Sequence, residues 1–253
     1  MVVEGDRSVR VLIDITRAGL RHIRHRGTAL VIGAATNISE LEEFPVIRDL
    51  AGGILSQAAA SCGSPQIRNV ATIGGNILHG SPAAELVTAL LVLDAVIVAA
   101  DGHGRHRSTL AAYLADGRET RPADSLLLEI LVPEPPGNGR SGWSFQKFGR
   151  TTVDISLANA AAGLQLDARG RVKWVRIALG AVAPTPFRAR AVEELMRGRT
   201  FDQTLLAEAG GEVMRAVRPV SDVRASADYR RELSRVLMGR ALEACAAQVG
   251  CSL

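Results

Sequence analysis

Cysteine, lysine and long apolar runs are all scarce in this chain of 253 residues, and each scarcity excludes a class of protein. The three cysteines form no CxxC pair, which argues against a disulfide framework and against a structural zinc or iron–sulfur site. The longest apolar run, residues 86–100, contains Asp94 and is too short to span a bilayer. Because the charged start lacks the apolar core of a signal peptide, we expect a cytoplasmic protein without a membrane span.

Positive charge comes almost entirely from arginine, since lysine occurs only at Lys147 and Lys173. The net charge is +4, and the arginines are scattered among acidic residues instead of forming one block. This distribution gives little support to nucleic-acid binding, so we expect no nucleic acid as a partner. Most arginines are expected on a solvated surface, and some are available to an acidic partner protein.

Recognisable sets of catalytic or metal-binding side chains are also missing. The pairs His22/His25 and His103/His106 have no carboxylate or cysteine to complete a metal site, so we expect exposed loop histidines and no metal. No serine belongs to a recognisable hydrolase triad. The adjacent glycines at residues 74 and 75 are not part of a GxGxxG fingerprint, and GxxxxGK[ST] does not occur, so a Rossmann fold and a P-loop NTPase are not indicated. We assign no catalytic residue.

Hydrophobic spacing predicts an α/β first part that ends at the linker of residues 135–139. Strands are expected at residues 9–15, 29–32, 95–100 and 126–132, with a polar connection after the first and a turn-rich loop at 101–108. A short helix is expected after Asn37 or Ser39, and another over residues 45–60 with a break near Gly52 and Gly53. Ser81 as N-cap and Pro82 at the first position predict a helix that ends near Leu93.

The second part is predicted to be α+β. Strands at residues 143–148, 155–166 and 172–179 form an antiparallel meander with a hairpin turn at 167–170, and helices follow from residue 190, the last one over 226–245. The expected domains are therefore residues 1–134 and 140–249. The whole chain is placed in the α+β class.

One short stretch, VATIGGNILHGSP at residues 70–82, raises the question of why two glycines stand together after an apolar run. Adjacent glycines suit a tight turn between buried elements. They also leave backbone N–H groups bare, so that an anion such as a pyrophosphate could lie on the main chain. The helix start expected just after them favours the second interpretation, because a helix N-terminus also attracts anions.

Residues 66–76 (QIRNVATIGGN), followed by SPAAEL from Ser81, closely resemble the flavin-binding loop of the medium subunit of molybdenum hydroxylases. That family includes the FAD subunits of aerobic carbon monoxide dehydrogenase and of bacterial xanthine dehydrogenase. The resemblance continues in LIDITRAGLRHI with LVIGAATNISELE, in FQKFGRTTVDISLANAAAGL and in RASADYRRELSRVLMGRAL, so it covers nearly the whole chain. It implies a two-lobed FAD-binding module with a C-terminal domain of antiparallel sheet and helices.

The resemblance also implies the cofactor-binding residues. The FAD diphosphate would be held by Thr72, Ile73, Gly74, Gly75 and Asn76. Glu85 stands where the family usually has an aspartate near the adenosine portion, although it could equally be a first-turn carboxylate that answers the helix dipole. Leu127 resembles a backbone contact of the flavin and could equally be plain core. Lys147 matches a position close to the isoalloxazine ring, where a cation would raise the reduction potential; the alternative is a solvated lysine on a strand.

The chain departs from the family in one respect, because no earlier glycine-rich loop of the AGGTD type occurs in it. The first lobe is therefore expected to be incomplete, either because the start codon was placed too late or because the subunit is shortened. By resemblance, the subunit passes electrons from a two-iron, two-sulfur small subunit through FAD to an external acceptor, while a molybdenum-cofactor large subunit oxidises the substrate. The alternative is a non-catalytic assembly subunit that has lost tight FAD binding. A free-standing flavin oxidase would need an acid/base pair, and none is apparent.

Overall fold

Antiparallel strand pairing builds two separate sheets in the computed structural model, which describes residues 11–116, 124–136 and 141–251. The first sheet has the strand order β1-β2-β5-β3-β4. Its strands are β1 (Ile23–Arg26), β2 (Ala29–Gly33), β3 (Val96–Asp101), β4 (Gly104–Thr109) and β5 (Leu126–Val132). The second sheet has the order β6-β7-β8-β9, with β6 (Ser141–Phe148), β7 (Ala158–Leu166), β8 (Val172–Gly180) and β9 (Phe187–Arg188).

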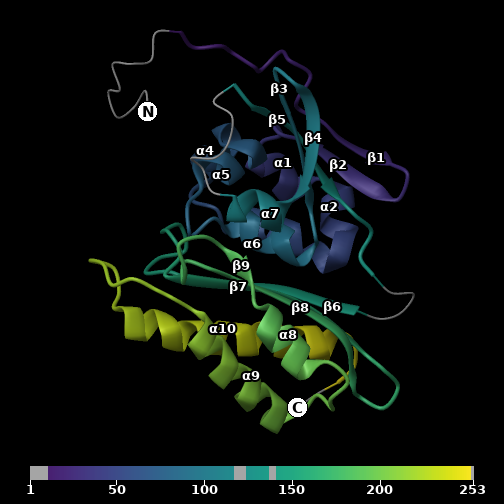
Figure 1. Ribbon diagram of the computed structural model, residues 1–253, viewed down its shortest axis with the longest axis vertical. Helices are drawn as coiled ribbons and strands as arrows, with labels where there is room; N and C mark the ends of the chain where they lie inside the picture. Colours follow the sequence, from purple (N-terminus) through teal and green to yellow (C-terminus); the bar gives the residue numbers. More distant parts are fainter. Residues whose placement is uncertain (1–10, 117–123, 137–140, 252–253) are drawn as a thin grey trace.

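Helices fill the space between the two sheets and cover the far side of the second one (Figure 1). The first group is α1 (Ile38–Glu43), α2 (Pro45–Asp49), the 3-10 turn η1 (Leu50–Gly53), α3 (Ile54–Ala60), α4 (Pro65–Val70), α5 (Ile73–His79), α6 (Glu85–Val92) and α7 (Leu110–Ala115). The second group is α8 (Arg190–Met196), α9 (Gln203–Ala216) and α10 (Ala227–Gln248). The molecule is thus a stack of sheet, helices, sheet and helices.

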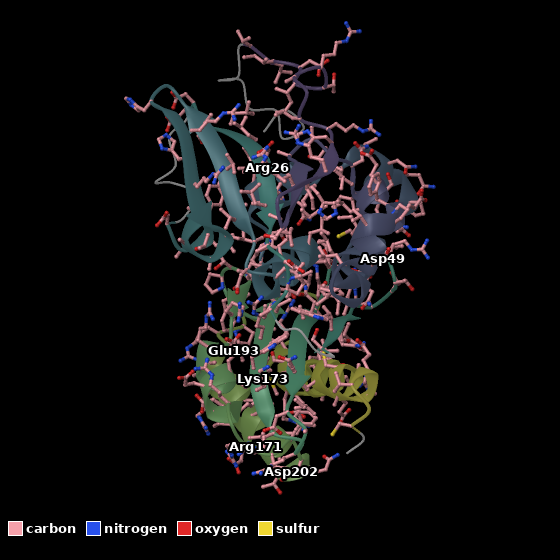
Figure 2. The ribbon with its side chains drawn as sticks, turned by 90° about the vertical axis from the view of Figure 1, so that its right-hand side faces the viewer. Arg26, Asp49, Arg171, Lys173, Glu193 and Asp202 are labelled. Carbon is pink, nitrogen blue, oxygen red and sulfur yellow. The ribbon has the colours of Figure 1, made fainter. Side chains whose placement is uncertain are left out.

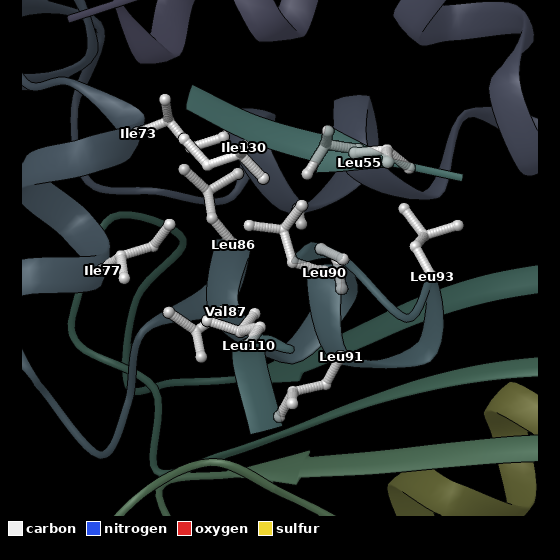
Figure 3. Close-up of a cluster of buried hydrophobic side chains, with 14 of the residues drawn as sticks. Leu55, Ile73, Ile77, Leu86, Val87, Leu90, Leu91, Leu93, Leu110 and Ile130 are labelled. Carbon is white, nitrogen blue, oxygen red and sulfur yellow. The ribbon is translucent and has the colours of Figure 1, made fainter. Parts of the chain in front are cut away.

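Helix α6 is the centre of the first hydrophobic core, and all eight of its residues are buried. Its leucines contact apolar side chains from α3, α5, α7 and β5 (Figure 3). A helix that is apolar on every side needs partners on every side. The second sheet supplies the remaining partner, because Trp143, Phe145, Ala161 and Ala178 belong to the same core cluster.

The second sheet is therefore buried on both faces. Along β7, Ala161 faces the first core, whereas Ala160 and Ala162 face a second core formed with α8, α9 and α10. Small side chains allow this close packing: a Cβ added at Gly163 would come within 2.5 Å of the Trp143 ring. The run of alanines in this strand reflects two packed faces.

An ion-pair network joins α6 to the second sheet at the end opposite its first turn. Arg188 is buried and lies 2.6 Å from Asp94, which follows α6, and 2.6 Å from Glu193 on α8. It also donates to the carbonyl of Leu91 at 3.0 Å. Arg176 of β8 adds a second contact to Asp94 at 2.7 Å. We call Arg188, Asp94, Glu193 and Arg176 the clamp.

Much of the sequence prediction is confirmed. Asn37 caps α1, the break near Gly52 and Gly53 separates α2 from α3, and the last helix, α10, covers nearly all of the predicted residues 226–245. The strands expected at 29–32, 95–100, 126–132, 143–148 and 172–179 are present within a residue or two at each end.

Several predictions about elements are wrong. The first part is not α/β, because every strand pairing among the described residues is antiparallel. Residues 11–15 form no strand, and residues 9 and 10 lie outside the described residues. Residues expected as a polar connection and as a turn-rich loop form the edge strands β1 and β4 instead, because main-chain pairing does not require apolar side chains. His25 and His106 consequently lie on exposed strands and not in loops.

Helix starts are also displaced from the prediction. The helix expected from Ser81 and Pro82 begins at Glu85, because Ser81 accepts hydrogen bonds from Ala83 and Ala84 in a preceding turn. Residues 155–157 precede β7 and are not part of it. The short helices α4, α5 and α7 were not expected. Each begins with a Ser or Thr N-cap that the apolar spacing alone did not single out.

Candidate functional site

Residues 73–79 of the glycine stretch form the short helix α5, and the adjacent Gly74 and Gly75 do not adopt the backbone angles that only glycine favours. Thr72 caps the helix by accepting the N–H of Gly75 at 3.0 Å. The N–H of Ile73 donates to Thr36, and that of Gly74 donates to Ala34. The expected row of free N–H groups is therefore not present at these positions, because the N–H groups of Ile73, Gly74 and Gly75 already donate hydrogen bonds within the chain.

The two glycines are required for different reasons. A Cβ at Gly74 would lie 2.6 Å from the carbonyl oxygen of Ala34, so α5 packs directly against the backbone that follows β2. A Cβ at Gly75 would meet only the hydroxyl of its own cap, Thr72, at 3.1 Å. Gly75 is exposed and lines a cleft. The missing side chain of Gly74 lets α5 pack against Ala34, and the missing side chain of Gly75 leaves space in the cleft.

This cleft has a volume of about 640 Å³ and lies between the first helix group and the second part of the chain. Its walls include Thr72, Gly75 and Asn76 from α5, Ala84 and Glu85 from the start of α6, and Val153, Asp154 and Ile155 from the segment before β7. Its size falls within the range of about 300–1,000 Å³ that is usual for small-molecule sites. Four of the predicted residues, Thr72, Gly75, Asn76 and Glu85, thus share one cleft.

Apolar side chains line much of the cleft. Ile67, Val70, Val153 and Ile155 are each more than half exposed and border it from both sides. No arginine or lysine is among its described lining residues. Such walls suit flat ring systems, while an anion would depend on hydroxyl, amide and backbone donors.

Glu85 and Lys147 form a largely buried ion pair at the inner end of the cleft. The Lys147 Nζ lies 3.1 Å from the Glu85 Oε1, and the two side chains are 9% and 11% exposed. Lys147 also donates to the carbonyl of Ser61 at 2.7 Å. Lys147 is therefore not a solvated lysine. The contact also brings together two residues that had been assigned to opposite ends of FAD.

The sequence did not predict two of the residues that contact Glu85. Ser156 donates to Oε1 of Glu85 at 2.8 Å, and the thiol of Cys62 lies 3.7 Å from Oε2. Burial, followed by the nearby charge of Glu85, raises the pKa of Cys62, so this thiol stays protonated. Neither residue belongs to a spacing motif, because they reach Glu85 only through tertiary packing.

A second pocket of about 450 Å³ lies next to the cleft, lined by Ser61 and by residues 147–152. Neighbouring residues in the sequence line different spaces. Ser61 and Thr152 line the pocket, whereas Cys62 and Val153 line the cleft. The Glu85–Lys147 pair lies in this partition, with Glu85 on the cleft side and Lys147 on the pocket side.

Two predicted site residues do not line the cleft. Ile73 is fully buried in the first core, and only its backbone helps to place α5. Leu127 is 3% exposed and belongs to the same core on β5. The structure shows a core role for both side chains, and the assignment of their backbones to the cofactor stays a prediction.

Comparisons with known proteins place the chain in one family. Residues 1–135 match the family described as FAD binding domain in molybdopterin dehydrogenase, and residues 143–245 match the CO dehydrogenase flavoprotein C-terminal domain. The chain belongs to the FAD-binding medium subunits of the molybdenum hydroxylases, and its cofactor is FAD.

Individual relatives agree with this. The chain is 33% identical over 235 residues to the 6-hydroxypseudooxynicotine dehydrogenase complex subunit alpha of Paenarthrobacter nicotinovorans, with 92% of this chain and 78% of that protein covered. It is 31% identical over 237 residues to the carbon monoxide dehydrogenase medium chain of Hydrogenophaga pseudoflava, with 92% and 80% covered. A solved structure of carbon monoxide dehydrogenase from the latter organism matches with a TM-score of 0.85 at 31% identity, over 91% of this chain and 79% of that one. The predicted fold class is therefore confirmed.

The residues of the cleft fit this cofactor. The Oδ1 atom of Asn76 is buried without a hydrogen-bond partner in the described structure, so this amide beside the cleft has unused hydrogen-bonding capacity. Helix α6 has no side-chain cap, and its first residues line the cleft, so its N-terminus opens onto the space beside Thr72 and Asn76. A helix N-terminus and hydroxyl or amide donors can receive a pyrophosphate without a cation.

Proposed function

We propose that this chain is the electron-transfer subunit of a molybdenum-dependent dehydrogenase, and that it passes electrons from a two-iron, two-sulfur small subunit through FAD to an external acceptor. A molybdenum-cofactor large subunit would oxidise the substrate. FAD, when bound, accepts electrons singly or in pairs, so it can link one-electron donors to a two-electron acceptor. The observation that carries the proposal is the cleft, in which Thr72, Gly75, Asn76 and the start of α6 meet.

In this proposal the chain binds and orients the cofactor and sets its electrostatics. The Thr72 hydroxyl, the Asn76 amide and the N-terminus of α6 would hold the diphosphate, and the apolar rim would cover the rings. Lys147 and Glu85 would act together as one neutral pair, because they are 3.1 Å apart. We also propose that the chain is divided into two domains, residues 1–134 and 140–249, whose junction the cleft spans.

The match of residues 1–135 to a FAD-binding family speaks against the alternative, an assembly subunit that has lost FAD. The exposed face at Gly75 also leaves room in the cleft for the cofactor. No helix of the described residues is long and apolar enough to cross a membrane.

A valine at Gly75 tests the proposal. Gly75→Val adds a branched side chain beside the cleft, and its Cβ meets only the Thr72 hydroxyl at 3.1 Å outside its own helix backbone, so we expect bound flavin per folded chain to fall strongly while the circular dichroism spectrum stays unchanged. Gly211→Val is the matched control, because Gly211 lies inside helix α9 and an added Cβ meets only the end of Arg215 at 4.0 Å.

The flavin-to-protein absorbance ratio of the purified folded fraction is the measurement. Equal flavin content in Gly75→Val and Gly211→Val would remove the cleft as the FAD site. A loss of folded protein in Gly75→Val alone would mean that the position serves packing, as Gly74 does.

A further inference from the structure

A second functional surface lies on the first sheet, on the face turned away from the helices. Strand register places Arg24 and Arg26 of β1, Glu129 of β5 and Arg105 and Arg107 of β4 on this face. Arg107 is opposite Val98, and Val98 is opposite Glu129, so the β4 arginines lie two strands from the carboxylate, roughly 10 Å away. We call these four arginines and Glu129 the arginine face.

Positive charge on this face is poorly compensated. Glu129 is the shared partner of Arg24 at 3.0 Å and Arg26 at 2.9 Å, and the two guanidinium-bearing side chains remain 56% and 46% exposed. Arg105 and Arg107 are exposed and have no ion pair or hydrogen bond in the described part of the chain. Among these five residues, four guanidinium groups and one carboxylate leave a net charge of +3, and His22 also lies 3.4 Å from Glu129.

The residues beneath the arginine side chains of this face are apolar and already buried. Val31 and Val98 are 0% and 3% exposed, yet neither belongs to the two core clusters, so they are covered on the outer side of the sheet. Arginine stems commonly cover apolar surface in this way while their charged ends stay in water. The arginine face thus combines buried valines with the exposed guanidinium groups of Arg105 and Arg107, which have no ion-pair partner in the described part of the chain.

We propose that the arginine face docks an acidic protein surface, one that belongs to another subunit of the same enzyme. Exposed guanidinium groups above buried apolar residues fit a protein partner that carries carboxylates, because arginine is enriched at protein interfaces. Arginine makes charge-assisted hydrogen bonds to carboxylates, as Arg24 and Arg26 already do on Oε1 of Glu129. Relatives of this chain are subunits of complexes, so such a partner fits the proposed function on which this inference rests.

The test uses the multi-subunit enzyme isolated through a tag on this chain from the organism that makes it. Arg105→Glu with Arg107→Glu reverses two charges that have no ion-pair partner within the described chain, so we expect the fold to be unchanged. Arg169→Glu with Lys173→Glu is the matched control, because these two exposed cations lie at the β7–β8 hairpin of the second sheet and have no ion pair there. Figure 2 shows Arg26 and Lys173 at opposite parts of the molecule.

Native mass spectrometry counts partner subunits per tagged chain at physiological salt. We expect the arginine-face variant to lose at least about tenfold of its partner, while the control keeps the wild-type ratio. Flavin per folded chain should be unchanged in both variants, so a failure of FAD binding is seen separately. Full partner content in the arginine-face variant would overturn the proposal, and so would an equal loss in both variants.

Two further arms exclude other occupants. The isolated chain is titrated with a 30-base-pair DNA duplex and, separately, with vesicles that contain phosphatidylglycerol. Binding of either probe that disappears in the arginine-face variant, together with an unchanged subunit ratio, would assign the face to nucleic acid or lipid and overturn the proposal. Hydrogen exchange of β1 and β4 should be slower in the wild-type complex than in the free chain, and equal exchange would also count against docking.

Discussion

The structure shows that Lys147 is a buried ion-pair partner and not a solvated lysine. Its ammonium group is largely buried against Glu85, with Ser61 as a second acceptor. Removal of one partner of a buried pair leaves an uncompensated charge, which costs about 3–5 kcal/mol of stability. We therefore expect Lys147→Met to lower the free energy of unfolding by about 3 kcal/mol, and Lys147→Met with Glu85→Gln to recover most of that loss. Denaturant titration of the three proteins measures both effects.

The same variants report on the flavin. Lys147→Met leaves the negative charge of Glu85 beside the cleft, so the flavin reduction potential should fall. The double variant restores a neutral pair and should return close to the wild-type potential. If the single variant lost stability but kept its potential, Lys147 would be a structural residue distant from the isoalloxazine.

At the scale of elements, helix α10 is anchored through its first turn. Arg230 is 5% exposed and donates to the carbonyl of Leu157 at 2.8 Å and to Asp222 at 2.9 Å. The backbone N–H of Arg224, together with Arg230 and the N–H of Ala225, lowers the pKa of Asp222 from 3.8 to about 2. The ionised carboxylate thus stabilises the folded chain more than the unfolded one.

Acid should release this anchor in a defined pH window. Because the folded pKa lies below the unfolded one, the stabilisation is complete above about pH 4 and is lost as the pH falls toward 2. Urea unfolding of wild type and Asp222→Asn at several pH values measures the difference in their midpoints. We expect that difference to be constant above pH 5 and to shrink between pH 4 and 2. Parallel curves through this range would show that Asp222 does not titrate with folding.

At the scale of the whole molecule, the clamp joins the two sheets through α6. Arg188→Met would leave Glu193, which is 4% exposed, without its main cation, and would free Asp94 and the end of α6. We expect the free energy of unfolding to drop by about 3 kcal/mol. Arg190→Met is the control, because Arg190 also pairs with Glu193 but is 67% exposed, so its loss should change stability by about 0.5 kcal/mol or less.

Thermal unfolding followed by circular dichroism and by tryptophan fluorescence provides the measurement. Trp143 and Trp174 lie in the second sheet and pack against the first core, so the fluorescence reports on the contact between the two layers. The two signals should coincide in wild type and separate in Arg188→Met, because the clamp and the shared core make the layers unfold together. Equal effects of Arg188→Met and Arg190→Met would contradict a role for the clamp.

The sequence by itself determined the family, the α+β class, most strands of the second part and the stretch that lines the cleft. These follow from local signals: apolar spacing, caps such as Asn37, and the TIGGN motif with its neighbours. Such signals act over a few residues, so they can be read along the chain.

Only the tertiary structure decided what those residues do. Gly74 and Gly75 are identical in the sequence, yet one packs on Ala34 and the other opens the cleft, because α5 presents them to different surroundings. Glu85 and Lys147 meet through contacts between distant segments, and pairing of distant strands places the arginines of β1 and β4 on one face of the first sheet. Ion pairing and burial depend on which segments pack together, and for these residues that is fixed by the whole stack of sheets and helices.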